Sequence, residues 1–238
     1  MTGIGTIANV AAIIIGCVLG WSFRRRIPGH WHQTLLQVLG VFTCLLGTQM
    51  FFTASQIGTP ILVPLVATLI GVMIGESLQL EQRLYALGHW LEADLSRRGW
   101  LEERVAQAFV TSSNLFAIGP IAIIGSLQDG LDRNPTLLFV KAAMDGVVSI
   151  AFTASLGLGT IFSCGPVLLY QGSITLLADK IQPWVTPPLL GVINSVGSLM
   201  LVSIGLNLLS LTKIPVTNLL PALAIGPILV YILPVSQP

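Results

Sequence analysis

The segment TLLFVKAAMDGVVSIAFTASL, residues 136–156, is long and apolar enough to cross a membrane as one helix. It nevertheless carries two ionisable residues, Lys141 and Asp145. Their spacing of four positions places both side chains on one face of a helix, one turn apart. Because an ionisable group is costly at mid-bilayer, such residues usually face a bundle interior or a wet path. The segment therefore predicts a membrane protein with a polar centre.

The composition of the whole chain also indicates a membrane protein. Of its 238 residues, 53% are hydrophobic and only 9% are charged, whereas a soluble domain has about 25% charged residues. The 24 glycines and 14 prolines indicate closely packed and interrupted helices. A net charge of +1 gives no electrostatic footprint for nucleic acid. We therefore expect the lipid bilayer as the main partner and no nucleic-acid partner.

Hydrophobic length predicts an all-α fold, a polytopic membrane helix bundle of seven or eight spans in a single integral membrane domain, residues 1–238. The eight candidate spans are Gly3–Trp21, Leu35–Phe52, Pro60–Leu78, Val105–Leu127, Thr136–Leu156, Gly157–Ala178, Pro187–Leu209 and Val216–Leu233. The fourth and sixth each contain a Gly-Pro pair, so we expect both to be interrupted. Basic residues concentrate in the first and third loops, which predicts that these loops are cytoplasmic and both termini outside.

One polar segment, residues 79–104, stands between the third and fourth spans. Its leucines recur at helical spacing, and most of its charged residues lie elsewhere around the helix. This pattern predicts an amphipathic connector on the cytoplasmic surface of the membrane. Both a docking surface for a partner protein and a simple connector lying on the lipid are compatible with it.

Internal similarities indicate repeated structure. AIIIGCVLG at residues 12–20 matches ATLIGVMIG at 67–75, and both contain a Gly-x-x-x-Gly pair that lets helix backbones approach closely. FAIGPIAIIGS at 116–126 parallels FSCGPVLLYQGS at 162–173. Paired interrupted spans are a sequence pointer to the binding site of a transporter, although two packing kinks would give the same pattern.

A third similarity predicts an inverted repeat. ILVPLVAT at residues 61–68 resembles NLLPALAI at 218–225, and Gly47 and Gly205 lie at nearly the same distance upstream. The second and third spans would then correspond to the seventh and eighth. Because corresponding spans are five places apart in the order of spans, an odd number, the copies would have opposite orientation in the membrane.

Several motifs together resemble the bacterial family of integral membrane proteins known as domain of unknown function 554 (DUF554). They are GSLQDGL (Gly125–Leu131), KAAMDGVVS (Lys141–Ser149), Ser163-Cys164-Gly165-Pro166, QGSIT (Gln171–Thr175), GLNLL (Gly205–Leu209), NLLPAL (Asn218–Leu223) and the initial GTIANVAAIIIG. The resemblance covers essentially the whole chain. It implies a multi-pass protein of the bacterial inner membrane and supplies neither a substrate nor catalytic residues.

The candidate binding site combines polar side chains with the two helix breaks. Its predicted members are Lys141, Asp145, Asp129, Asn114, Gly119, Pro120, Ser163, Gly165, Pro166, Gln171, Asn194 and Asn207. Amide, hydroxyl and carboxylate oxygens suit a hard cation or a polar solute, and Asp145 could instead carry a proton. A static ion pair that joins two helices is the alternative for Lys141 and Asp145. For Asp129 the alternative is a solvated position in an outer loop.

These features predict a transporter of a small solute or an ion, with its site between the Gly-Pro-interrupted helices. A non-transporting sensor or scaffold that acts through residues 79–104 is the alternative, and a channel is the third. The sequence has no phosphate-binding loop and no recognisable catalytic motif, so we expect neither a cofactor nor enzymatic activity; it specifies no metal. The Gly-x-x-x-Gly pairs also allow a homo-oligomer.

Overall fold

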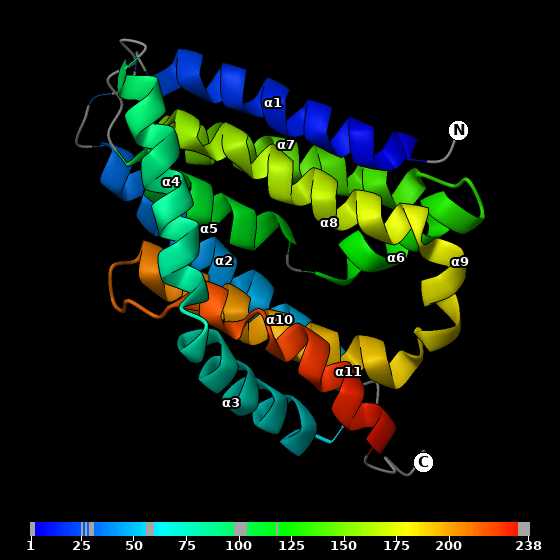
Figure 1. Ribbon diagram of the computed structural model, residues 1–238. Coiled ribbons are helices and arrows are strands. Elements are labelled where there is room, and N and C mark those ends of the chain that lie inside the picture. The colour runs from blue at the N-terminus through cyan, green and yellow to red at the C-terminus, as the bar shows by residue number, and fades with distance from the viewer. Residues whose placement is uncertain are drawn as a thin grey trace. The chain divides into compact units, whose positions relative to one another are not determined.

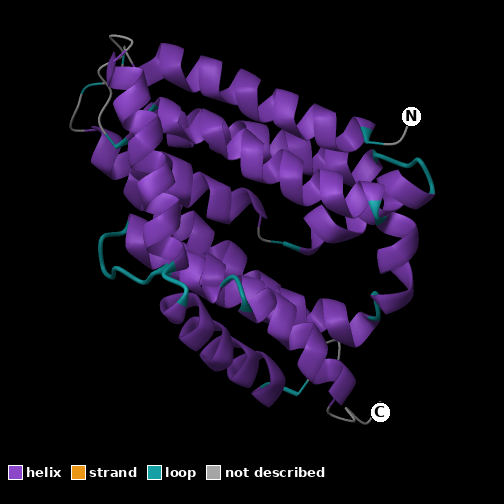
Figure 2. Ribbon diagram, viewed as in Figure 1, coloured by secondary structure: helices purple, strands orange, loops and turns teal. Residues whose placement is uncertain are grey.

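A computed structural model describes residues 3–24, 26, 28, 31–55, 60–97, 104–117 and 119–232 (Figure 1). All regular elements in these residues are helices (Figure 2). They are α1 (Ile4–Arg24), α2 (Trp31–Ser55), α3 (Leu62–Ser77), α4 (Leu80–Arg97), α5 (Val105–Ala117), α6 (Pro120–Leu131), α7 (Thr136–Leu156), α8 (Cys164–Leu176), α9 (Ala178–Ile181), α10 (Pro187–Leu208) and α11 (Ala222–Ile232), with the 3₁₀ helices η1 (Leu158–Ser163), η2 (Gln182–Trp184) and η3 (Val216–Leu219). The predicted all-α fold is confirmed.

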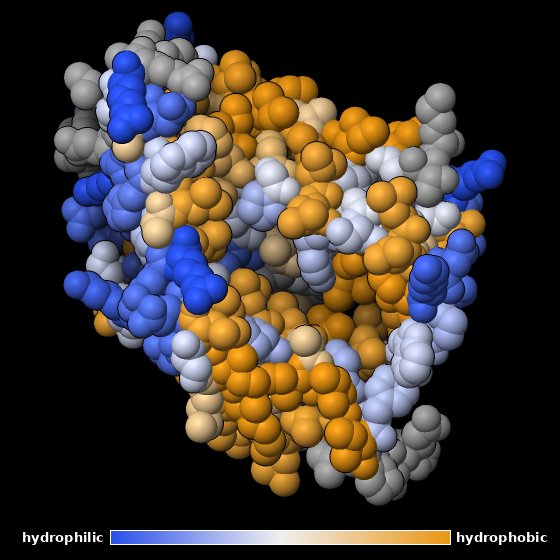
Figure 3. All heavy atoms as spheres, in the orientation of Figure 1, coloured by the Kyte–Doolittle hydropathy of each residue, from blue (hydrophilic) through white to orange (hydrophobic). Residues whose placement is uncertain are grey.

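The helices account for the predicted spans. Within the described residues, α1, α2, α7 and α10 are each long and apolar enough to cross a membrane alone. Three bent helix pairs raise the number to seven: α3 with α4 (52°), α5 with α6 (62°), and η1–α8 with α9–η2 (70°). A shorter apolar stretch, Val216–Ile232, corresponds to the predicted eighth span. Hydrophobic side chains cover the visible faces of α3 and α11, as lipid-facing helices require (Figure 3).

One of the two predicted interruptions lies at its Gly-Pro pair. Helix α5 ends at Ala117 and α6 begins at Pro120. Between them Gly119 has a φ of +135°, a backbone conformation that side chains other than glycine rarely adopt. In the sixth span the helix continues through Gly165 and Pro166, with Pro166 in the first turn of α8, and the 70° bend lies instead between Leu176 and Ala178. A proline is tolerated there because its missing N–H has no partner in a first turn.

The chain forms two compact units. Unit 1 consists of Met1–Gln37, Leu84–Ala117 and Ile121–Pro183, and unit 2 consists of Val38–Arg83, Ile118–Pro120 and Trp184–Pro238. The single domain expected from the sequence stays a prediction.

In unit 1, α1 and α7 lie side by side along their lengths (Figure 1). A methyl group on Gly16 would collide with the carbonyl oxygen of Gly146, and one on Gly20 with that of Ile150. Residue numbers at the contact rise together in both helices, so the helices run parallel. Two parallel spans need an odd number of crossings between them, and the predicted topology supplies three.

Unit 2 contains two antiparallel pairs that also rely on small residues. Helix α2 meets α10 where Gly40 approaches Gly205. Helix α3 meets the start of η3 and α11, where Gly71 contacts Ala222 and Gly75 contacts Asn218. Both directions agree with eight alternating spans. The two Gly-x-x-x-Gly copies therefore form the close backbone contacts that the sequence predicts, one in each unit.

The predicted amphipathic connector forms α4, and its residues 98–103 lie outside the described part. Leu84, Leu91 and Leu95 are half-buried, whereas Trp90 is 64% exposed. Hydrophilic residues gather over α4 (Figure 3). An amphipathic helix is thus present, and its cytoplasmic location stays a prediction.

We expect Gly16→Ala to lower the free energy of unfolding by about 1–3 kcal/mol, because the added methyl group forces α1 away from a backbone carbonyl of α7. Gly172→Ala is the matched control, since an added Cβ there meets no atom within 4 Å. Thermal unfolding in detergent measures both variants. Equal melting temperatures would contradict the glycine contact.

Candidate functional site

Lys141 and Asp145 form a buried ion pair on α7. The Lys141 Nζ atom donates to Asp145 Oδ2 at 2.5 Å. The two residues are 6% and 8% exposed, respectively. Asp145 is the tenth residue of the 21 in α7, about 14 Å along the helix axis and so near the centre of a span. The pair therefore lies near the middle of a helix that is long and apolar enough to cross a membrane.

Two amide side chains from other helices complete the network around Asp145. Asn9 Nδ2 on α1 donates to Asp145 Oδ2 at 3.0 Å and to Gln171 Oε1 on α8 at 3.2 Å. Both amides are fully buried. We call Asn9, Lys141, Asp145 and Gln171 the central network. It joins three helices of unit 1 through side-chain hydrogen bonds alone.

Close packing brings these side chains together. Glycine at residue 5 places α1 directly against Leu138 of α7. On α8, the Cys164 thiol lies 3.8 Å from the Val10 carbonyl oxygen of α1. Asn9 therefore sits between α7 and α8, within reach of both polar groups.

The central network is incomplete within the protein. The Oδ1 atom of Asn9 and the Nε2 atom of Gln171 are buried and make no hydrogen bond to any protein group. An unpaired buried polar atom costs free energy unless a ligand or solvent satisfies it. The network thus offers one acceptor and one donor beside a carboxylate whose charge Lys141 balances.

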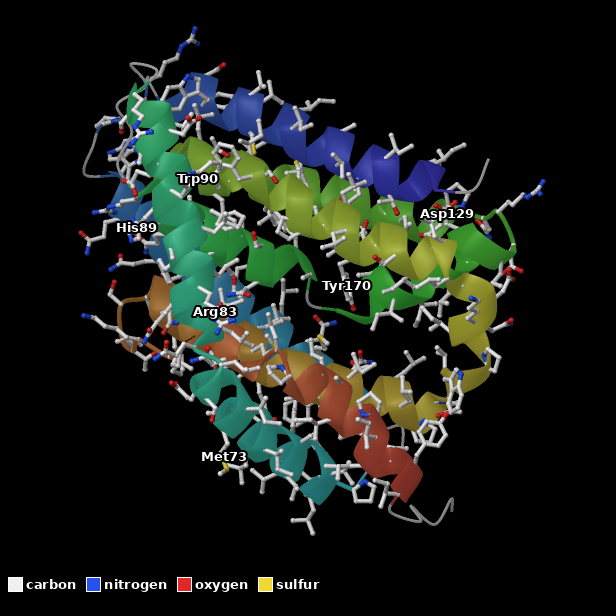
Figure 4. All side chains as sticks on the ribbon, in the orientation of Figure 1. Met73, Arg83, His89, Trp90, Asp129 and Tyr170 are labelled. Carbon is white, nitrogen blue, oxygen red and sulfur yellow. The ribbon has the colours of Figure 1, made fainter. Side chains whose placement is uncertain are left out.

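Asp129 is buried rather than part of a solvated loop. It lies on α6 with no exposed surface, and its Oδ2 atom accepts a hydrogen bond of 3.0 Å from the Gly5 backbone N–H. Figure 4 places it beside the first turn of α1. The exposed residues begin with Asp132 and Arg133, immediately after α6 ends.

The other predicted residues are distributed over both units. In unit 1, Asn114 and Ser163 are buried, and the Ser163 hydroxyl donates to the Thr160 carbonyl oxygen within η1. Gly165 is exposed and Pro166 half-buried in the first turn of α8. Pro120 is helical, but its side chain lies outside the described part, and Gly119 is grouped with unit 2.

The two asparagines of unit 2 that were predicted as site residues have different surroundings. The side chain of Asn207 holds the loop that follows α10. Its Oδ1 atom accepts hydrogen bonds from the Thr212 hydroxyl and the Ile214 backbone N–H, and its Nδ2 atom donates to the Ile214 carbonyl oxygen. Asn194 is 7% exposed on α10, with an Oδ1 atom that has no hydrogen-bond partner. Asn207 therefore has a local structural role in addition to its predicted one.

The family model described as "Protein of unknown function (DUF554)" matches residues 4–231. The chain belongs to this family. Two relatives cover nearly the whole DUF554 chain: "Uncharacterized membrane protein YdfK" of Bacillus subtilis (strain 168) is 27% identical over 229 residues, 96% of each chain. "Uncharacterized protein YqgA" of Escherichia coli (strain K12) is 27% identical over 225 residues, 94% of each chain. No solved structure matches the chain.

Membership in DUF554 agrees with the architecture. One relative is named a membrane protein, and this DUF554 chain has several helices able to span a bilayer. A multi-pass location in the bacterial inner membrane, as predicted, fits both findings. Within the described part of the chain, no three His, Cys, Asp or Glu side chains converge to hold a metal ion.

Asn9 was not among the site residues predicted from the sequence of this DUF554 protein. It makes both hydrogen bonds that connect the helices of the central network. The signal was present in the first span, GTIANVAAIIIG, where Asn9 is the only amide in an apolar stretch. An amide inside a spanning helix usually finds a partner on another helix.

Removing one member of the ion pair should destabilise the protein more than removing both. Lys141→Met leaves an uncompensated buried carboxylate, which costs about 3–5 kcal/mol, whereas the double variant Lys141→Met/Asp145→Leu should recover much of this loss. Lys180→Met, at an exposed lysine, is the control and should change stability by less than about 0.5 kcal/mol. Thermal unfolding of purified protein measures all three; a double variant as unstable as Lys141→Met would contradict the ion pair.

Proposed function

We propose that this DUF554 protein transports an ion or a small polar solute across the bacterial inner membrane, with Asp145 at the centre of its binding site. One observation supports the proposal more than any other. A buried carboxylate near the middle of a spanning helix is surrounded by amides from two further helices, and those amides retain polar atoms without protein partners.

The unpaired atoms favour a binding site over a purely structural ion pair. A partly satisfied polar network is less stable than an apolar core of the same volume, so stability alone gives no reason to keep one. In transporters, polar groups at membrane depth bind the substrate or coupling ion. The interrupted span that carries Gln171 adds to this argument, because discontinuous helices commonly border such sites.

Lys141 has a defined role in this proposal. With no cation bound, its ammonium group neutralises Asp145. A cation that binds Asp145 would compete with Lys141 for the same carboxylate oxygen, and Asn9 Oδ1 offers a neutral second ligand. Binding and release of the substrate would then move Lys141 away from Asp145 and back.

The proposal includes the inverted repeat, and contacts inside unit 2 support it. The aligned glycines, Gly47 and Gly205, are 158 residues apart (205 − 47 = 158), as are Cys44 and Val202, which contact each other. The same offset relates the contact of Gly47 with Ser198 to that of Gly205 with Gly40. Reciprocal antiparallel contacts of this kind are expected around a pseudo-two-fold axis.

Transport is tested with proteoliposomes that carry gradients of Na⁺, K⁺ or H⁺, singly and with polar solutes. We expect Asp145→Asn to reduce any flux of the wild type by at least about tenfold, because the carboxylate supplies the charge that binds the substrate. The amide is nearly the same size but leaves Lys141 without its counter-ion, so flux is compared only in protein that gel filtration shows to be folded.

Asp132→Asn is the control, since it removes the same charge from an exposed position. Wild-type flux in folded Asp145→Asn protein would overturn the proposed site. Rapid passive conductance without coupling would assign the protein to the channels instead.

A scaffold function is a second candidate because the amphipathic helix α4 exposes large apolar side chains. Leu87 is 47% exposed and Trp90 is 64% exposed. If α4 binds a partner protein, Leu87→Ser/Trp90→Ser should abolish co-purification of that partner while flux stays unchanged. Loss of flux with retained folding would instead connect α4 to transport.

A further inference from the structure

We propose that unit 1 contains a second site, around Asp129, that binds one dehydrated alkali-metal cation. This inference goes beyond the proposed transport, because equilibrium binding would be measurable in a protein that moves nothing. It begins with the charge of a fully buried carboxylate. Lys141 is paired with Asp145, and no described cationic side chain forms an ion pair with Asp129.

The first turn of α1 compensates only part of the negative charge of Asp129. The Gly5 backbone N–H donates to Asp129 Oδ2 at 3.0 Å, and the partial positive charge of a helix N-terminus stabilises a nearby anion by about 0.3–2 kcal/mol. Burying an unpaired carboxylate costs considerably more than that. Asp129 therefore requires a further positive partner.

Buried oxygen atoms without hydrogen-bond partners lie on α6 and on the two helices that contact it beside Asp129. Among the described residues, eleven buried side-chain atoms have no hydrogen-bond partner; six of them lie on the three helices α1, α6 and α8, and five of those six are oxygens. They are Thr6 Oγ1, Asn9 Oδ1, Ser126 Oγ, Asp129 Oδ1 and Thr175 Oγ1. The residues that carry them are at most 3% exposed.

Helix packing brings the residues that carry four of these oxygens close to one another. Thr6 follows Gly5, the residue that contacts Asp129. Ser126 precedes Asp129 by three positions on α6 and so shares its face. A methyl group on Gly130 would lie 2.5 Å from the Thr175 carbonyl oxygen, so α6 and α8 touch beside Asp129. Asn9, one turn after Thr6 on α1, connects this group of oxygens to the central network.

The donor set defines the ligand. Oxygen donors without nitrogen or sulfur select hard cations. One carboxylate among neutral hydroxyls balances a single positive charge, which favours an alkali-metal ion over Ca²⁺ or Mg²⁺.

The experiment measures the melting temperature of the purified full-length protein in detergent at constant pH and ionic strength. N-methyl-D-glucamine chloride is replaced stepwise by NaCl or KCl. We expect the melting temperature of the wild type to rise and saturate, because a ligand that binds only the folded state stabilises it. Asp129→Asn should remove this rise, and Asp132→Asn, an exposed acid three residues away, should retain it.

Thr175→Val keeps the side-chain shape and removes only a hydroxyl. It therefore tests the cation site even if Asp129→Asn fails to fold. We expect it to weaken the apparent cation affinity at least about tenfold. A wild type that does not respond to either salt, or a full response in folded Asp129→Asn or Thr175→Val, would overturn the site. So would a melting temperature that depends on pH and not on cations, since Asp129 would then hold a proton.

Discussion

The parallel contact between α1 and α7 is the constraint on which the polar interior of unit 1 depends. Gly16 and Gly20 allow the two backbones to approach until side chains of α7 and carbonyl oxygens meet α1 directly. At this separation an asparagine, with its short side chain, is long enough to bridge α1 to both α7 and α8. Small residues at the interface and polar residues beside it are thus parts of one arrangement.

The same contact explains why two buried carboxylates can coexist. Asp145 is balanced by a lysine one turn away, and Asp129 is held by the first turn of α1, four residues before Asn9. The two acidic groups therefore touch one helix about 6 Å apart along its axis. Each has a different local source of positive potential, a side chain in one case and a helix terminus in the other.

Local patterns in the sequence predicted much of this. The spacing of Lys141 and Asp145 was sufficient to predict the ion pair, because side chains four residues apart are neighbours on any helix. The Gly-Pro pair at 119–120 predicted the break before α6, since proline restricts the backbone locally, whereas the pair at 165–166 is accommodated in the first turn of α8. Asn9 could not be placed, because 136 residues separate it from Asp145 and nothing local specifies the partner of a distant amide. Asp129 was ambiguous for the same reason: its buried position depends on contact with Gly5, 124 residues earlier.

The parallel pairing of α1 with α7 has a consequence for biosynthesis. The ribosome delivers α1 first, and its partner follows only after three further spans have been made. At about 5–20 residues per second, Asn9 waits on the order of ten seconds for Asp145. During that interval α1 lacks the helix that its amide and its glycines contact in the folded protein. Premature contacts of α1 with other helices must therefore be avoided or reversed before α7 is inserted.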